Sequence, residues 1–411
     1  MTTATARPFD LRADEILRTI RQGGQEKILQ VLESPMDARV RIRRPDGSIL
    51  DALCFCSNNY LGLANHPEVV EAGVKALRDF GAGTASVRFI CGTFSPHLAL
   101  EETIARYMGT ESAYTFVSCW TATEALFPTL CEAGDFILSD ELNHACIIDA
   151  IRLTPVIKKG VKKGVYKHAD LADARRKLEA VRADPEVTGQ VWLVTDGVFS
   201  MEGAVADLPA LRALCDEFNA ILIVDDSHGH GVMGERGRGT HEYWKMPLTP
   251  NDPRGIDVFT GTLGKALGGG AGGFVAGPKR VTDLIVQRGR PTLFSNALPV
   301  TVAASAKAAI DVLMREPQRV KKLRDNVASA RKKIGAAGFD VLESPTAILP
   351  IIVGDTAKAI AMSKRLLDMG VFVIGFGFPV VPEGAARLRV QISAAHEPAD
   401  IDALVDALKK L

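Results

Sequence analysis

From about residue 66 onward, the sequence alternates between segments with helical spacing of apolar residues and short apolar runs. The runs lie at residues 113–117, 136–139, 164–166, 191–195, 221–225, 258–262 and 273–276. The helical segments between them include residues 172–182 and 208–218. Because strands that alternate with helices form a mainly parallel sheet covered on both faces, this pattern predicts a large α/β domain.

The segments on either side of this pattern have other periods. Residues 11–33 predict a leading amphipathic helix, and residues 42–56 alternate around Asp46-Gly47, which predicts a hairpin. A long helical stretch at 300–337 is followed by predicted strands at 339–342, 348–353, 372–374 and 386–392 and helices at 356–369 and 398–411. We therefore expect three parts, which are an N-terminal arm (1–55), a large α/β domain (56–298) and a C-terminal α+β domain (299–411).

Composition argues against several classes of partner. The 411 residues hold 49 Lys and Arg against 49 Asp and Glu, so nothing favours a nucleic acid or an anionic membrane. The longest apolar stretch, Val371–Val381, is too short to span a bilayer, and Met1–Arg12 lacks the features of a signal peptide. The seven cysteines show no metal-binding spacing, which indicates reduced thiols in a cytoplasmic protein without a metal site.

A lysine follows one of the predicted strands within a glycine-rich segment. The motif Gly261-Thr262-Leu263-Gly264-Lys265 has only two residues between its glycines and is followed by alanine, so it is not a nucleotide P-loop. Glycines let the backbone approach a ligand closely, so Thr262 could bind a phosphate while Lys265 reaches an aldehyde. For this motif alone, a surface lysine in a flexible loop remains an alternative.

An acidic residue ends the most apolar of the predicted strands. Asp225 follows Ile221–Val224, and His228 comes three residues later. Ligands of open α/β sheets bind outside the carboxyl ends of the strands, where a poorly solvated acid requires a cationic partner. A protonated pyridine nitrogen is such a partner, and with Lys265 it points to pyridoxal 5'-phosphate (PLP). An acid that caps the next helix is the structural alternative for Asp225.

Three further motifs fit the same cofactor. Cys119 and Trp120 open a predicted helix whose free backbone N–H groups could bind phosphate. His144 follows a strand and could stack on the pyridine ring or be purely structural. Arg387 and Arg389 share one face of an alternating strand, so one of them is a candidate for a substrate carboxylate and the other is structural.

Together these motifs resemble the α-oxoamine synthases, PLP-dependent enzymes of fold type I, over nearly the whole chain. The similar stretches are 56–62, 85–93, 195–201, 260–269, 293–296 and 393–396. Stretch 85–93 is most similar to the glycine C-acetyltransferases, also called 2-amino-3-ketobutyrate CoA ligases. The resemblance implies an acyltransferase that condenses glycine with acetyl-CoA to 2-amino-3-oxobutanoate and CoA, reversibly, in threonine catabolism.

The resemblance also assigns roles to residues around the cofactor. Lys265 would hold PLP as a Schiff base and later act as the base, with Asp225 on the ring nitrogen, His228 on the phenolic oxygen and His144 stacked on the ring. The backbones of Cys119 and Trp120, with the hydroxyl of Thr262, would hold the phosphate. Ser200 would lie beside the cofactor.

The substrate and the second subunit complete the site that the resemblance implies. Arg389 would bind the carboxylate of the amino acid, assisted by Asn58 or Asn59. Ser295 and Asn296 would reach the phosphate of the partner subunit, so the active unit would be a homodimer.

Some positions depart from the family pattern and leave the substrate open. Thr123 stands where the family has asparagine, Trp120 replaces a smaller aromatic residue, the loop 244–255 is longer, and Gly229-His230 replaces Ala-Val. Alternatives are therefore a sister enzyme that uses alanine, serine or a longer acyl-CoA, an aminotransferase on the same fold, and a non-catalytic PLP-binding protein. The basic residues at 158–163 could meet CoA phosphates or form a solvated face.

Overall fold

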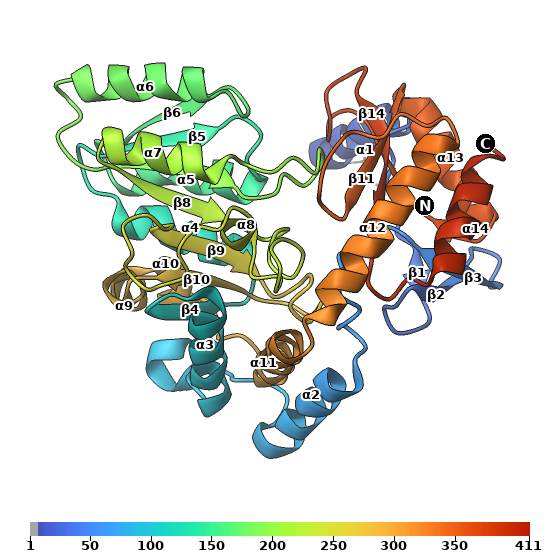
Figure 1. The fold of residues 1–411 in the computed structure, drawn as a ribbon, viewed down its shortest axis with the longest axis horizontal. Helices are drawn as coiled ribbons and strands as arrows, with labels where there is room; N and C mark the ends of the chain where they lie inside the picture. The colour runs from blue at the N-terminus through green and yellow to red at the C-terminus, as the bar shows by residue number, and fades with distance from the viewer. Residues whose placement is uncertain (1–6) are drawn as a thin grey trace.

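A seven-stranded sheet forms the centre of the large domain (Figure 1). The computed structural model describes residues 7–411. In spatial order, the sheet contains β4 (Ser112–Phe116), β10 (Gly273–Gly277), β9 (Val258–Thr262), β8 (Ala220–Asp225), β7 (Val191–Asp196), β5 (Phe136–Asp140) and β6 (Lys162–Tyr166). Strands β5 to β9 are parallel, and β10 pairs antiparallel with both β4 and β9. The predicted strands and mainly parallel sheet are confirmed.

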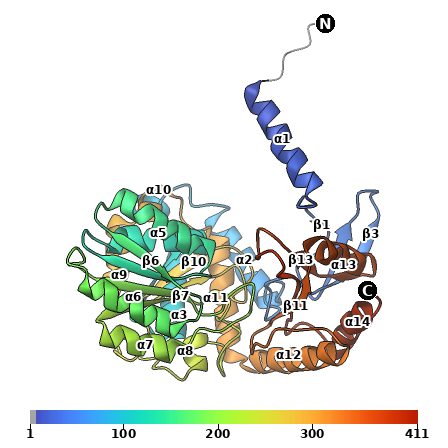
Figure 2. The same ribbon diagram turned by 90° about the horizontal axis from the view of Figure 1, so that it is seen from above.

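Helices cover both faces of this sheet, as Figure 2 shows. The helices in this part of the chain are α2 (Pro67–Phe80), α3 (Ser95–Met108), α4 (Cys119–Leu130), α5 (Ala145–Ile157), α6 (Leu171–Ala183), α7 (Leu208–Glu217), α8 (Thr240–Tyr243), α9 (Lys279–Arg288), α10 (Arg290–Phe294) and the π-helical turn η1 (Arg88–Gly92). Successive residues of a strand point to opposite faces, so in β8 Leu222 and Val224 enter one hydrophobic core and Ile223 the other. Burial on both faces explains why these strands are apolar without alternation.

Two smaller sheets lie beside the large domain. The first has the order β1 (Val31–Leu32), β2 (Arg39–Arg43), β3 (Ile49–Cys54) and β12 (Val371–Phe372), and the second has β11 (Ile348–Gly354), β14 (Ala386–Gln391) and β13 (Ile374–Phe376). Because β12 pairs in parallel with β3, the predicted hairpin is joined to the C-terminal part of the chain. The division at residues 55 and 298 stays a prediction, and residues 1–6 of its N-terminal arm lie outside the described residues.

The remaining helices are α1 (Pro8–Gln22), α11 (Val300–Arg315), α12 (Gln318–Ala336), α13 (Thr356–Asp368) and α14 (Pro398–Leu408). The predicted helix 11–33 was too long, because α1 ends before Gly23 and Gly24, and Gly24 has a φ of +64°. The stretch 300–337 is interrupted at Pro317, which starts a second helix. The predicted strand 339–342 was wrong, since only Val341 forms a bridge there, with Ile351.

Helix α1 projects away from the body of the molecule, as Figure 2 shows, and none of its described residues is buried. Along residues 7–411, we find no helix that combines the length and the apolar character needed to cross a membrane.

A buried ion pair joins η1 to α3 and β4. Arg88 donates two hydrogen bonds to Glu101, of 2.7 Å and 3.1 Å, and Glu101 also accepts the backbone N–H and the hydroxyl of Thr115. The guanidinium lies 4.7 Å from the centre of the Tyr114 ring. Through Thr115, this pair ties the C-terminal part of β4 to η1 and α3.

Replacing Glu101 should therefore destabilise the fold strongly. In Glu101→Ala, the buried Arg88 loses its counter-ion, which typically costs about 3–5 kcal/mol. Urea unfolding measures the change in free energy. Asp283→Ala is the matched control, because it breaks the exposed pair of Lys279 and Asp283 and should change stability little. Equal effects of the two substitutions would contradict the structural role of Glu101.

Candidate active site

The carboxyl ends of the central strands bring two acids together. Strands β7 and β8 are in register, so that Asp196 lies opposite Asp225, and Thr260 of β9 lies on the other side of Asp225. Both carboxylates are buried. Lys265 follows β9 after one short turn, so this edge of the sheet holds two acids and one amine, as expected for a ligand site of an open α/β fold.

Asp225 stays ionised despite its burial. Its carboxylate accepts the backbone N–H of Ser227 (3.0 Å), the hydroxyl of Thr260 (2.9 Å) and the thiol of Cys119 (3.4 Å). Burial alone would raise the pKa of Asp225, but the hydrogen bonds from Ser227 and Thr260 and the charge of Lys265 outweigh it and lower the pKa. A buried anion of this kind fits the protonated ring nitrogen of PLP.

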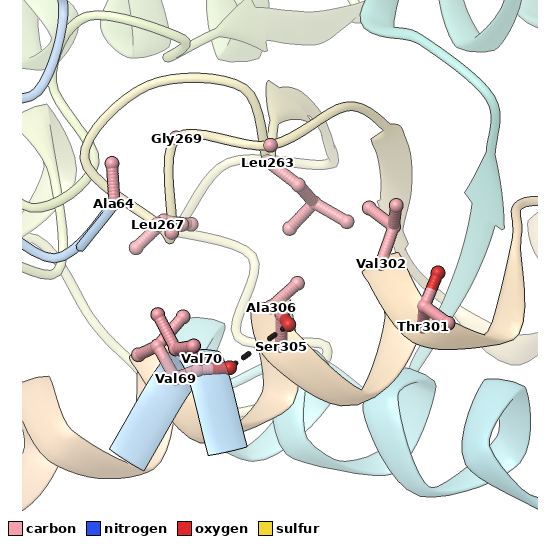
Figure 3. A pocket seen from close by; sticks show the side chains of 12 residues that line it. Ala64, Val69, Val70, Leu263, Leu267, Gly269, Thr301, Val302, Ser305 and Ala306 are labelled. Carbon is pink, nitrogen blue, oxygen red and sulfur yellow. Dashed lines mark hydrogen bonds between the residues drawn. The ribbon is translucent and has the colours of Figure 1, made fainter. Parts of the chain in front are cut away.

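Lys265 is held by a packed loop. Thr262 donates its hydroxyl hydrogen to the carbonyl of Gly272 and accepts the N–H of Gly264, which closes the turn before the lysine. Leu263 and Leu267 point toward an apolar hollow of about 220 Å³ between the loop and helices α2 and α11 (Figure 3). These contacts argue against a surface lysine in a flexible loop.

The electrostatic surroundings of Lys265 lower the pKa of its amine. Burial lowers its pKa, and Arg389 lowers it further, while Asp225, Cys119 and Asp196 act in the opposite direction and do not cancel the effect. A neutral amine is the form that attacks an aldehyde or accepts a proton.

His144 is positioned by Asp196, a residue that sequence reasoning missed. The backbone N–H of His144 donates to Asp196 (3.1 Å), and its ring Nδ1 accepts the N–H of Cys146 (3.2 Å). Trp120 meets the His144 ring edge-on, with ring centres 6.3 Å apart. His144, Asp196, Asp225 and Trp120 line one hollow. The signal for Asp196 was present in the sequence, since it ends a buried strand just as Asp225 does.

The start of helix α4 provides a cradle for an anion. Ser118 caps the helix by accepting the N–H of Thr121, which leaves the N–H groups of Cys119 and Trp120 without a partner among residues 7–411. A side chain at Gly273 would come within 2.3 Å of the Cys119 backbone, so only glycine lets β10 approach here. Helix N-termini bind phosphate, and this one lies beside Asp225 through the Cys119 thiol.

The two arginines of β14 differ in their partners. Arg387 contacts Glu202 (3.3 Å) and the carbonyls of Met201 and Ala385. Arg389 donates from Nη1 to Gln391 (3.0 Å), while its buried Nε and Nη2 have no partner within residues 7–411. Arg389 thus has a free two-donor edge of the shape that binds a carboxylate, whereas the guanidinium of Arg387 is already engaged.

The two predicted asparagines also differ. The amide of Asn59 donates to Met36 (3.3 Å) and accepts the N–H of Ala64 (3.1 Å), so it holds the local backbone. Asn58 instead accepts a 2.7 Å hydrogen bond from Gln391, the partner of Arg389. The structure therefore brings Asn58, rather than Asn59, to the arginine.

His228 is buried among polar groups. Its Nδ1 lies 2.9 Å from the hydroxyl of Tyr60. Burial and the charges of Lys265 and Arg389 lower the pKa of His228 well below its ordinary value, so the ring is neutral. Tyr60 was not expected from the sequence.

Ser200, Ser295 and Asn296 are the remaining predicted residues. Ser200 is half-buried in the turn that follows β7. Ser295 and Asn296 line a small hollow with Thr121 of α4, and Asn296 bridges Val87. Their predicted contact with a partner subunit stays a prediction.

The basic segment 158–163 is remote from the site. Lys162 is the first residue of β6, so it lies at the amino ends of the parallel strands, opposite the carboxyl ends where the site is. Lys158 pairs with Glu132 (2.9 Å) and Lys162 with Asp184 (2.7 Å). The charges of Lys158 and Lys162 are therefore already paired with acids, away from the carboxyl ends of the strands.

Comparison with known proteins agrees with this geometry. The family model described as "Aminotransferase class I and II" matches residues 51–408. The chain is 42% identical to the 2-amino-3-ketobutyrate coenzyme A ligase of Salmonella typhimurium over 96% of its own length and 95% of that protein. It is 39% identical to the 8-amino-7-oxononanoate synthase of Thermoanaerobacter pseudethanolicus, with 97% and 95% covered.

A solved structure described as SPT with PLP internal aldimine has a TM-score of 0.87 and 28% identity, with 98% and 96% of the chains covered. The fold is that of the PLP-dependent transferases of fold type I, as the sequence predicted. The chain belongs to the aminotransferase class I and II family and, within it, to the α-oxoamine synthases.

Asp196 offers a test of how the site is organised. Burial and the neighbouring Asp225 raise the pKa of Asp196 well above its ordinary value, which favours the neutral acid, and its carboxyl group accepts the backbone N–H of His144. We expect Asp196→Ala to weaken PLP binding to the apoprotein roughly five- to tenfold, since a lost hydrogen bond costs about 1 kcal/mol.

Asp196→Asn is the control for charge, because it keeps the acceptor oxygen without any ionisable group. It should bind PLP nearly as tightly as the unmodified protein in a fluorescence titration. Equal weakening in both variants would mean that a charged Asp196 is needed.

Proposed function

We propose that this enzyme condenses glycine with acetyl-CoA to give 2-amino-3-oxobutanoate and CoA, and that it catalyses the reverse reaction in threonine catabolism. The observation that carries the proposal is the free donor edge of Arg389, because its guanidinium lies close enough to the amine of Lys265 to lower that group's pKa. An amino-acid carboxylate on Arg389 would bring the substrate amine and α-carbon to the lysine. The 42% identity to a 2-amino-3-ketobutyrate coenzyme A ligase supports glycine and acetyl-CoA as the substrates.

The side chains of the site divide the work of such a reaction. When bound, PLP supplies an electron sink for negative charge that develops at the substrate α-carbon. Lys265, whose pKa is lowered by its surroundings, accepts the α-proton. Asp225 holds a proton on the ring nitrogen through its negative charge, and Arg389 holds the substrate carboxylate. His144 lines the same hollow as Asp225, where its ring could stack on the cofactor.

The phosphate and the second subunit are part of the same proposal. The N-terminus of α4 would hold the phosphate, Thr262 would join it by turning its hydroxyl hydrogen from the carbonyl of Gly272 to the phosphate, and Ser200 would lie beside the ring. A homodimer is supported by a set of exposed apolar side chains on α2, η1, α3 and α10, namely Val70, Leu77, Phe80, Phe89, Ile90, Leu98 and Phe294. Ser295 and Asn296 directly follow α10 and would contribute to the partner's phosphate site. We propose a cytoplasmic location from the reduced cysteines.

A sister reaction is the closest alternative. The 8-amino-7-oxononanoate synthase of T. pseudethanolicus is 39% identical, and Arg389 would bind the carboxylate of glycine, alanine or serine alike. A panel of amino acids and acyl-CoAs therefore tests the substrate directly.

We expect CoA release to be fastest with glycine and acetyl-CoA and to fall with alanine, serine or longer acyl chains. Lys265→Ala should lose the absorbance band of the lysine-bound cofactor and nearly all CoA release, because the amine that accepts the α-proton is gone. The exposed Lys279→Ala serves as the control. Preference for a long acyl chain would indicate a sister enzyme, and a pyridoxamine form made with a keto acid would indicate an aminotransferase.

Arg389→Ala should raise the apparent KM for glycine at least tenfold and leave that for acetyl-CoA nearly unchanged. The reason is that charge-assisted hydrogen bonds to a carboxylate are worth about 1.5–3 kcal/mol. Steady-state kinetics with each substrate varied in turn measures the difference. Arg387→Lys on the same strand is the control, and equal changes of both KM values in Arg389→Ala would argue against the carboxylate role.

A further inference from the structure

A continuous chain of hydrogen bonds connects Arg389 to His228. Arg389 Nη1 donates to Gln391 Oε1 (3.0 Å), and Gln391 Nε2 donates to Tyr60 Oη (2.9 Å). The Tyr60 hydroxyl lies 2.9 Å from His228 Nδ1. All four side chains are buried, and Tyr60 and Gln391 are only 1% and 2% exposed. The chain therefore runs through the protein interior, where water does not compete for these groups.

The charge of Arg389 fixes the orientation of the Gln391 amide. A guanidinium can only donate hydrogen bonds, so the amide oxygen of Gln391 must face Arg389. The amide nitrogen then faces the other way and donates both hydrogens, one to Tyr60 (2.9 Å) and one to Asn58 (2.7 Å). A flipped amide would place its own N–H groups against those of the guanidinium. It would also leave Tyr60 and Asn58 without a hydrogen-bond donor.

The orientation of Gln391 in turn directs the hydrogen of Tyr60. Because the Tyr60 oxygen accepts from Gln391, its own hydrogen must be donated to another acceptor. The nearest is His228 Nδ1 at 2.9 Å, whereas Asn58 Oδ1 is 3.4 Å away. Burial raises the pKa of Tyr60, so the hydroxyl keeps its proton. A neutral imidazole that accepts at Nδ1 carries its hydrogen on Nε2.

We propose that Gln391 and Tyr60 are positioning residues that transmit the donor character of Arg389 to His228 and hold its ring in the Nε2–H tautomer. The role of that tautomer rests on the proposed function, in which His228 donates to the phenolic oxygen of PLP. Only Nη1 of Arg389 is used by this chain, so the free Nε and Nη2 can bind a substrate carboxylate without breaking it.

Nitrogen NMR of the apoprotein with ¹⁵N-labelled histidine tests the tautomer without any cofactor. The chain has eight histidines, and His228→Gln identifies the signals of His228. We expect a protonated Nε2 and an unprotonated Nδ1 in the unmodified protein. Tyr60→Phe, which lacks the donor, should convert this single form into a mixture of both tautomers.

Gln391→Glu provides a second variant, because a carboxylate accepts from Arg389 and also accepts the Tyr60 hydrogen, which turns it away from His228. It should give the same mixture. Tyr114→Phe is the matched control, since Tyr114 is a buried tyrosine whose hydroxyl has no partner within the described residues, and its removal should leave the His228 signals unchanged. A proton on Nδ1 in the unmodified protein, or an unchanged tautomer in both variants, would overturn the proposal.

Kinetics separates this proposal from the proposed function. With glycine and acetyl-CoA, Tyr60→Phe should lower kcat about fivefold, which corresponds to one hydrogen bond of about 1 kcal/mol, and leave KM for acetyl-CoA unchanged. If the NMR result holds but the unmodified protein does not release CoA from these substrates, the proposed function fails and the tautomer assignment stands. If CoA is released at normal rates and the variants keep the tautomer, the positioning role fails alone.

Discussion

The site depends on one buried carboxylate that remains ionised. Asp225 is a buried acid whose pKa would rise on burial, and it is held in its charged form by Ser227, Thr260 and the nearby Lys265. Each of these partners comes from a different piece of chain near the ends of β8 and β9, so the parallel sheet is what assembles them. A shift of β9 by one residue would turn Thr260 to the opposite face and remove its hydrogen bond.

The same carboxylate organises the charges around it. Asp225 lies opposite Asp196, and two adjacent buried acids cannot both be ionised at low cost. Asp225 has the amine and the hydroxyl donors, so Asp196 is the acid whose pKa is raised and whose neutral form is favoured. Burial lowers the pKa of both His144 and His228, and the positive charge of Lys265 lowers both further. The result is a site in which Asp225 and Arg389 hold fixed charges, the histidines are neutral and the pKa of the Lys265 amine is lowered.

The sequence predicted the large sheet well because its central strands, such as β7 and β8, are buried on both faces and therefore read as apolar runs. It failed where the outcome depends on local details, as at Gly23 and Gly24, which end α1 early, and at Val341, where one bridge replaces a strand. The site residues that could be predicted, such as Asp225 and Lys265, sit next to strand ends and have a chemistry that stands out against apolar neighbours.

Tyr60 and Gln391 could not be predicted in this way. They meet only because the segment after β3 and strand β14 are brought together across more than three hundred residues of chain, and each looks in the sequence like an ordinary polar residue of a strand or turn. Their importance follows from the direction of their hydrogen bonds rather than from the type of residue. Arg389 accepts no hydrogen bond, so every donor and acceptor beyond it is determined in turn, and the last group in the sequence of contacts is His228. A chain of neutral groups can therefore convey the sign of a buried cation to a ring that must itself stay uncharged, which a direct ion pair at His228 could not do.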